Sequence, residues 1–278
     1  MDRPLPSPYS EEDKFMRTLS MLAAGVSIFL AASAGRADVW DEGGDADNTC
    51  GSTPDNDLLH GADQVHDLGA LPAAQVDQDF YSFIAQPFAS YEAVVDGITG
   101  DLNNGGNPDF VFERVSSACV AVQTAEPVGF GFSKSLRFEA PSLFAGALRV
   151  GSAACGTGCT SADQYHIRFY ETTYAIPRFN NSSTQLTVLI VQNPANYSIN
   201  VTPRFFDSAG ALITSTPFTL APRATQVLNT ATIPALAGLN GSIVISHTGR
   251  YGDLAGKAVA LEPATGFSFD TAMTPRPH

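Results

Sequence analysis

The sequence predicts an all-β protein with two β-sandwich domains behind a secretory signal peptide. Three observations support this fold class. Apolar and polar residues alternate in many short runs, and Gly, Pro, Asn and Asp separate the runs. After the N-terminal apolar segment, no stretch shows a helical repeat of apolar residues. Alternation with a period of two, interrupted by turn residues, is typical of antiparallel strands with one buried face.

The N-terminus has the pattern of a secretory signal. Lys14 and Arg17 precede the apolar run LSMLAAGVSIFLA at 19–31, and the small residues Ala32, Ser33 and Ala34 follow it. An apolar core of about 13 residues is short for a permanent membrane helix. We therefore assign residues 1–37 to an N-terminal extension and signal peptide, with a buried or membrane-anchoring helix as the alternative. A secreted protein is expected, in the periplasm, at the cell surface or outside the cell, with no permanent membrane span.

Charge divides the remaining chain into two parts. Residues 38–113 contain sixteen Asp and Glu and no Lys or Arg, whereas residues 175–278 contain four acids and six bases. This difference predicts an acidic domain at 38–174 and a near-neutral domain at 175–278, each long enough for its own core. Nucleic acid is excluded as a partner because no basic stripe is present to neutralise phosphates.

The alternating runs place the expected strands. In the acidic domain they are FYSFIA (80–85), YEAVVDGI (91–98), DFVFERV (109–115), CVAVQT (119–124), SLRFEA (135–140), GALRVG (146–151) and YHIRFYE (165–171). In the second domain they are LTVLIVQN (186–193), YSINVTPRFF (197–206), ALITSTPFTL (211–220), ATQVLNT (224–230), GSIVISH (241–247), GKAVALE (256–262) and FSFDT (267–271). Seven strands in about 100 residues is typical of an immunoglobulin-like sandwich.

The cysteines fit an oxidising compartment. An even number of cysteines in an exported chain predicts disulfides, and four cysteines allow three pairings. Cys155 and Cys159 are close enough in CGTGC to close their own loop, which leaves Cys50 to pair with Cys119 on a strand. A zinc site would need four converging ligands, and the spacing does not supply them.

The run VDQDFYSFIAQPFASYEAVVDGI resembles the core of bacterial pre-peptidase C-terminal (PPC-like) domains. The residues that match the family pattern are Asp77, Asp79, Phe80, Tyr81 and Phe83. The family's Ala-Gly turn is replaced by QPFA at 86–89, and the resemblance covers residues 38–174. It implies a PPC-like, jelly-roll-like sandwich. Such domains are accessory modules of secreted proteins and are usually not catalytic. Some relatives bind collagen or carbohydrate, and some hold calcium through an acidic entry segment.

The second domain resembles an uncharacterised module at the ends of exported bacterial proteins. The residues that carry this resemblance are IPRFNNSSTQLTVLIVQNP (176–194) and GKAVALEPATGFSFDTAMTPRP (256–277). The resemblance implies no activity.

Two acidic segments are candidate calcium sites, because calcium binds six to eight oxygen ligands on a loop that wraps around the ion. The first is DLNNGGNPDF, where Asp101, Asn103 and Asp109 supply side-chain oxygens. The second is the leader DVWDEGGDADN, whose carboxylates are Asp41, Glu42, Asp45 and Asp47. The alternatives are a polar hairpin turn, with Asn and Gly at positive φ, and a solvated linker.

Catalytic signals are weak in this sequence. His60 and His66 lie in LHGADQVHDLG together with Asp63 and Asp67, a combination that suits zinc binding or acid–base chemistry. A polar loop before the first core strand explains the same residues. His166 lies in an alternating run and is expected on the surface of a sheet.

The sequence thus favours a secreted, non-catalytic binding or structural protein that contacts an extracellular polysaccharide or protein, with calcium as a candidate cofactor. Trp40, Tyr81 and Tyr91 are candidate sugar-stacking residues, and the alternative for each is a place in the core. The second hypothesis is a secreted hydrolase of unrecognised type, or an accessory module of one.

Overall fold

The computed structural model describes residues 50, 56–69, 77–103, 110–127, 133–152, 160–182 and 184–276. All of them fall in the compact unit Ala37–His278. The signal-peptide assignment lies outside the described residues. In the described part of the chain, no helix has the length and apolar character needed to cross a membrane.

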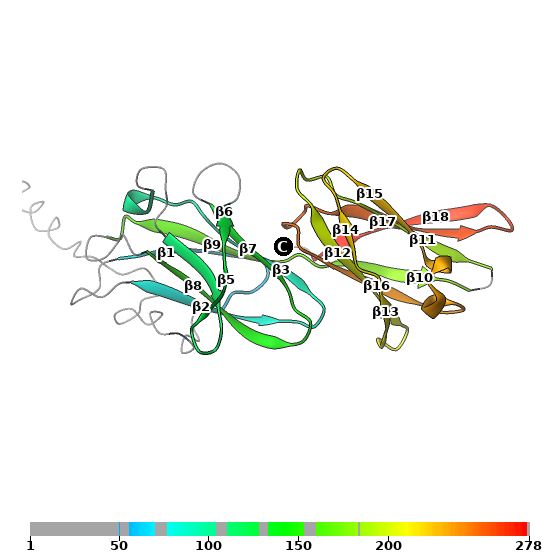
Figure 1. The fold of residues 1–278 in the computed structure, drawn as a ribbon, viewed down its shortest axis with the longest axis horizontal. Coiled ribbons are helices and arrows are strands. Elements are labelled where there is room, and N and C mark those ends of the chain that lie inside the picture. Colours follow the sequence, from blue (N-terminus) through cyan, green and yellow to red (C-terminus); the bar gives the residue numbers. More distant parts are fainter. Residues whose placement is uncertain are drawn as a thin grey trace, which may run out of the picture. The chain divides into compact units, whose positions relative to one another are not determined.

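The first half of the described chain folds into two antiparallel sheets (Figure 1). Its strands are β1 (Ala62–Asp67), β2 (Gln78–Ala85), β3 (Ser90–Asp96), β4 (Phe110–Val115), β5 (Ala121–Thr124), β6 (Glu126–Pro127), β7 (Lys134–Glu139), β8 (Phe144–Ser152) and β9 (Gln164–Glu171). One sheet has the order β1-β9-β3-β7-β6 and the other has the order β2-β8-β4-β5. A short 3-10 helix, η1 (Gly100–Asn103), follows β3.

The second half forms another pair of antiparallel sheets. Its strands are β10 (Tyr174–Asn180), β11 (Leu186–Gln192), β12 (Ile199–Asp207), β13 (Leu212–Ser215), β14 (Phe218–Leu220), β15 (Thr225–Asn229), β16 (Asn240–His247), β17 (Ala255–Glu262), β18 (Phe267–Ala272) and β19 (Thr274–Pro275). One sheet has the order β13-β12-β16-β10-β19, with β14 also pairing with β12, and the other has the order β15-β11-β17-β18. Two short 3-10 helices, η2 (Thr230–Thr232) and η3 (Pro234–Leu236), follow β15.

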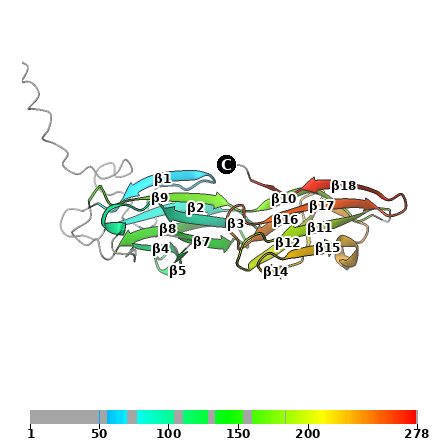
Figure 2. The same cartoon turned by 90° about the horizontal axis from the view of Figure 1, so that it is seen from above.

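Alternation along the strands builds the first core. On β2, Tyr81 and Phe83 are 0% and 2% exposed. Ile84, which lies between Phe83 and the buried Ala85, is 64% exposed. Inward residues of β2 and β9 belong to one buried cluster between the two sheets, whose strands overlap in the view of Figure 2. Tyr91 stacks on Phe169 with ring centroids 5.4 Å apart, a favourable aromatic arrangement.

A separate cluster of buried apolar residues fills the second pair of sheets. Phe179 of β10 and Phe205 of β12 meet edge to face at 5.4 Å, and both are fully buried. Leu189 of β11 packs in the same cluster. The all-β prediction is therefore confirmed: the described residues contain no α-helix, and four antiparallel sheets carry the fold.

One segment differs from the polar loop considered for it. The part of LHGADQVHDLG that holds His66 is a strand, because residues 62–67 form β1 and pair with β9, and His60 lies in the turn before it. The short polar run escaped notice because its partner strand lies about a hundred residues later in the sequence. The connection between the two pairs of sheets is short, since β9 ends at Glu171 and β10 begins at Tyr174.

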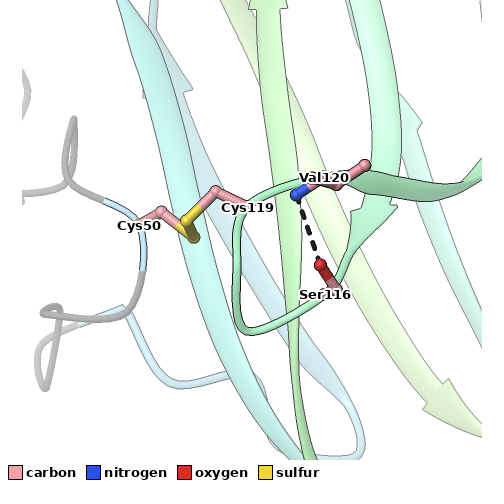
Figure 3. The surroundings of a disulfide bond; sticks show 4 residues. All are labelled: Cys50, Ser116, Cys119 and Val120. Atoms are coloured by element: carbon pink, nitrogen blue, oxygen red, sulfur yellow. Dashed lines mark hydrogen bonds between the residues drawn. A yellow bond between two sulfur atoms is a disulfide. The ribbon is translucent and has the colours of Figure 1, made fainter.

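The disulfide between Cys50 and Cys119 is formed, as the sequence favoured, and closes a separation of 69 residues. Figure 3 shows Cys119 in the turn between β4 and β5, not on a strand as predicted. Its φ is +64°, and the N–H of Val120 donates to Ser116 Oγ at 3.3 Å across the same turn. The bond therefore ties the N-terminal segment to a β-hairpin. Cys155 and Cys159 lie outside the described residues.

Candidate functional site

Strand β9 presents a row of polar and aromatic side chains on the outer face of its sheet. Residues 165, 167 and 169 are at most 2% exposed, because they point into the core. The residues between them, His166, Arg168 and Tyr170, lie on the opposite face and are partly exposed. This is the expected outcome of strand alternation, so the surface row and the core are set by the same run YHIRFYE.

An aromatic group lies at one end of this row. Tyr170 and Tyr251 have ring centroids 5.1 Å apart with planes tilted by 31°. His60 lies against both rings, 6.0 Å from Tyr251 and 6.5 Å from Tyr170. We call His60, Tyr170 and Tyr251 the aromatic platform. All three side chains are half-buried, and burial raises the pKa of the Tyr170 hydroxyl above its ordinary value.

Polar contacts fix the platform residues in place. Nδ1 of His60 accepts the backbone N–H of Glu171 at 2.8 Å, which assigns the proton of a neutral ring to Nε2. Tyr251 donates its hydroxyl to the carbonyl oxygen of Arg276 at 3.0 Å. The Arg276 guanidinium in turn pairs with Glu171 at 2.5 Å. Hydrogen bonds to Glu171 and Arg276 thus hold His60 and Tyr251 of the aromatic platform in place.

The backbone that carries Tyr251 is anchored on a buried carboxylate. Glu92 of β3 is 3% exposed, and its two oxygens accept the N–H of Tyr251 at 2.7 Å and the hydroxyl of Ser135 at 2.8 Å. Burial raises the pKa of Glu92, and these hydrogen bonds offset only part of that effect. The carboxylate serves as a fixed acceptor beneath the platform.

A second anchor joins the end of β9 to the second pair of sheets. His247 is 1% exposed, and its Nε2 lies 2.8 Å from the carbonyl oxygen of Thr172. Because Nδ1 accepts the N–H of Gly249 at 3.0 Å, the ring is neutral with its proton on Nε2. The backbone N–H of His247 donates to Ser90 Oγ at 3.2 Å. Burial lowers the pKa of His247 to about 4, which the bond to Thr172 only partly opposes.

Charged side chains form the other end of the row. Asp63 of β1 accepts from Arg168 at 3.2 Å and lies 3.1 Å from Nδ1 of His166. Arg168 also pairs with Asp96 of β3. Slight burial alone would raise the pKa of Asp63, but the bonds to His166 and Arg168 outweigh it and lower the pKa. Two carboxylates, Asp63 and Asp96, thus share one guanidinium on this sheet face.

The predicted histidine pair is not brought together. His60 belongs to the aromatic platform, whereas His66 is fully buried in the first core. The His66 ring lies 4.9 Å from the ring of Tyr81 and 5.9 Å from that of Tyr165. The two tyrosine hydroxyls are 2.5 Å apart. His66 therefore packs against two buried tyrosine rings of the core and is shielded from solvent.

The predicted sugar-stacking tyrosines are core residues. Tyr81 is 0% exposed and Tyr91 is 3% exposed, so the core alternative holds for both. Trp40 lies outside the described residues. His166 lies on the surface of a sheet, as expected, with 36% of its side chain exposed.

The candidate calcium ligands fall largely outside the described residues. This applies to Asp109 and to the leader carboxylates Asp41, Glu42, Asp45 and Asp47. Asp101 and Asn103 lie in η1 by their backbone, and their side chains are outside the described part. Among the residues that the structure describes, no three His, Cys, Asp or Glu side chains converge as metal ligands would.

Sequence reasoning missed the aromatic platform, although one of its residues could have been found from the sequence. Tyr170 was within reach, because the alternation that buries Phe169 exposes its neighbour. Tyr251 lies in the turn SHTGRYGD, where no periodicity operates, and only the tertiary fold brings it to Tyr170.

Comparison with known proteins identifies no family. No family model and no curated protein matches the chain. Among solved structures, the crystal structure of Bacteroides uniformis beta-glucuronidase is 9% identical with a TM-score of 0.19, over 72% of this chain and 26% of that one. A glycosyl hydrolase family 2 member from Bacteroides cellulosilyticus DSM 14838 is 8% identical with a TM-score of 0.21, over 76% of this chain and 31% of that one. This chain spans between a quarter and a third of those chains. Similarities this low carry no argument, and the resemblance to PPC-like domains stays a prediction.

Proposed function

We propose that this chain is an exported, non-catalytic binding protein that attaches to a neutral extracellular polysaccharide through the aromatic platform. The observation that carries the proposal is the pair of half-buried tyrosine rings, Tyr170 on β9 and Tyr251 in the turn between β16 and β17, held 5.1 Å apart. Export is supported by the N-terminal sequence and by the disulfide, a bond typical of oxidising compartments.

The chemistry of the platform suits a sugar ring. A pyranose has one face lined with C–H groups and an edge of hydroxyls. Tyrosine offers a rigid apolar face for the first and a hydroxyl for the second. The neighbouring charged row, with Asp63, Arg168 and Asp96, supplies donors and acceptors for hydroxyls farther along a chain. A platform followed by a polar row therefore fits an extended glycan lying across the sheet.

The charge of the protein favours a neutral polymer. The formal net charge is −13 at pH 7, so a polyanionic glycan would meet a long-range repulsion. A neutral chain meets no such barrier, and its hydroxyls require only the local hydrogen-bonding groups that the charged row offers.

The test is affinity electrophoresis of the purified chain in gels with soluble neutral β-glucan, xylan or glucomannan, with pull-down on cellulose and chitin. Tyr170→Ala and Tyr251→Ala should each weaken binding by about 2- to 12-fold, the range expected for one lost aromatic contact. The matched control is Ile84→Ala, which removes an exposed apolar side chain from the other sheet. Thermal melts show whether each variant is folded.

Two results would count against the proposal. Binding that folded platform variants retain unchanged would mean that the platform is not the contact surface. Release of new reducing ends from any polymer, abolished by His166→Ala, would instead favour the hydrolase hypothesis, for which the His166–Asp63 pair is the best-placed acid–base group.

A further inference from the structure

Strand β18 leaves an aromatic sheet edge open at the side of the second sandwich. It is the last strand of the order β15-β11-β17-β18, so it pairs with β17 on one side only. Phe267 and Phe269 are 65% and 50% exposed. Between Phe267 and Met273 the strand contains no proline. A free edge with exposed aromatic residues is a template for pairing with another strand.

The two phenylalanines lie on the face of the sheet that elsewhere forms the core. Phe269 pairs with Ala260 of β17, and Ala260 pairs with Thr187 of β11. Leu189, two residues further along β11, shares this face and is fully buried. The opposite sheet covers the face at β11 but leaves it open at β18. The exposed rings are therefore core-facing side chains without a complete cover.

A small pocket lies beside these rings. It is lined on β17 and β18 by Ala258, Ala260, Phe269 and Thr271, and its volume is about 20 Å³. That is room for roughly one water-sized group. The pocket is too small for a sugar ring, but an apolar side chain placed over its mouth would cover it.

The opposite sheet is protected against strand addition where β10 extends beyond its pairing with β19. In β10, Pro177 lacks an N–H, and the register shifts between Ile176 and Phe179. The N–H of Asn180 is already bonded to Thr187 Oγ1 at 2.9 Å. Of these two neighbouring edges, β18 is the one that is open for pairing.

The hydrogen-bonding pattern fixes which groups of β18 face outward. Met273 donates its N–H to the carbonyl oxygen of Gly256 in β17 at 3.2 Å. Because antiparallel bonding alternates along a strand, Thr271, Phe269 and Phe267 also direct their backbone groups toward β17. The N–H and C=O groups of Ser268, Asp270 and Ala272 then point to the free edge.

We propose that two copies of this chain pair through β18, edge to edge and antiparallel, with Phe269 on the two-fold axis. Hydrogen bonds across the dimer require the outward-facing residues of one β18 to lie opposite outward-facing residues of the other. Two antiparallel registers meet this condition and pair five of the six residues of β18. One places Phe269 opposite Phe269 of the second copy, with Ser268 opposite Asp270. The other places Asp270 opposite Asp270, a juxtaposition of like charges that is destabilising although each carboxylate also pairs with Lys257 of its own chain at 2.5 Å. Charge therefore selects the register centred on Phe269.

In that register each copy completes the other's sheet. Phe267 of one copy lies opposite Thr271 of the other, on the face that carries the pocket, so its ring covers the pocket mouth. The two Phe269 rings face each other as a cross-strand aromatic pair. The arrangement is closed by its two-fold symmetry and leaves no β18 edge free for further growth. The inference is independent of the polysaccharide proposal, since it uses a different surface.

Matched charge variants at one exposed position test both the dimer and its register by sedimentation equilibrium. Ser268→Asp places two like-charged pairs against Asp270 across the interface and should weaken the dimer by about 2- to 30-fold. Ser268→Lys creates two opposite-charge pairs and should strengthen it by a similar factor. Ser268 is exposed, so neither change disturbs the core of the monomer.

Cysteine cross-linking gives a second readout. In the proposed register Phe269→Cys places two thiols directly opposite at a pair that is not hydrogen-bonded, where the Cβ atoms are about 4.5–5.5 Å apart. Mild oxidation should give a covalent dimer, whereas Phe267→Cys and Ala272→Cys should give little. The unsubstituted chain is the control, because any cross-link that it forms must come from its native cysteines.

Several outcomes would overturn the proposal. These are a monomer at all concentrations up to about 100 μM, a dimer that neither Ser268 variant changes, or assemblies that keep growing with concentration. Cross-linking through Ala272→Cys instead of Phe269→Cys would reject this register, and with it the proposed cover of the pocket.

Discussion

His247 should make this protein less stable as the pH is lowered from 7.5 to 5, because it is buried as a neutral ring. Its pKa is about 4 in the folded state, against about 6.5 in the unfolded chain. Between these values the unfolded state binds the proton and the folded state does not, so protonation favours unfolding. The linkage relation gives a loss of about 2 kcal/mol in the free energy of unfolding over this pH interval.

Urea denaturation at pH 7.5 and pH 5 measures this loss, and His247→Gln isolates it. Glutamine stays neutral, so the variant should be less stable at pH 7.5 and lack the His247 contribution to the pH dependence. Glu92 acts with the opposite sign: its raised pKa gives stability that is lost as the pH rises. That contribution cancels when wild type and variant are compared. His166→Gln is the control at a surface histidine.

The reasoning is refuted if wild type and His247→Gln lose the same stability between the two pH values. It also fails if His166→Gln, and not His247→Gln, removes the pH dependence. Either result would mean that the His247 ring does not take up a proton when the protein unfolds at pH 5, as its burial in the neutral form requires.

Three further outcomes are expected. Replacing Cys50 and Cys119 with Ser together should cost about 2–4 kcal/mol in urea melts, since the bond closes a 69-residue separation; an unchanged midpoint would deny the bond a stabilising role. Gly146→Ala should cost about 1–3 kcal/mol, because its Cβ would lie 2.3 Å from the Phe83 ring; a variant as stable as wild type would show that the core can move aside. If the 101–109 loop or the acidic leader binds calcium, the thermal midpoint should be higher with calcium than with chelator, and equal midpoints would refute the calcium prediction made from the sequence.

The sequence was sufficient for most of the strands. The run YHIRFYE became β9 and LTVLIVQN became β11, because strand alternation is a local pattern that burial of one sheet face imposes directly. Pro217 explains why ALITSTPFTL, read as one run, forms the two strands β13 and β14: proline cannot donate a backbone hydrogen bond to a ladder.

The chain by itself determined the all-β class and favoured the pairing of Cys50 with Cys119, because both follow from local composition and from the count of cysteines. Tertiary structure alone decided that Tyr251 lies beside Tyr170, that His66 is buried while His60 is at the surface, and that the β18 edge stays open. Each of these depends on which distant strands and turns become neighbours. Packing between the sheets decides which segments become neighbours, and the alternation of apolar and polar residues along a strand does not encode this pairing.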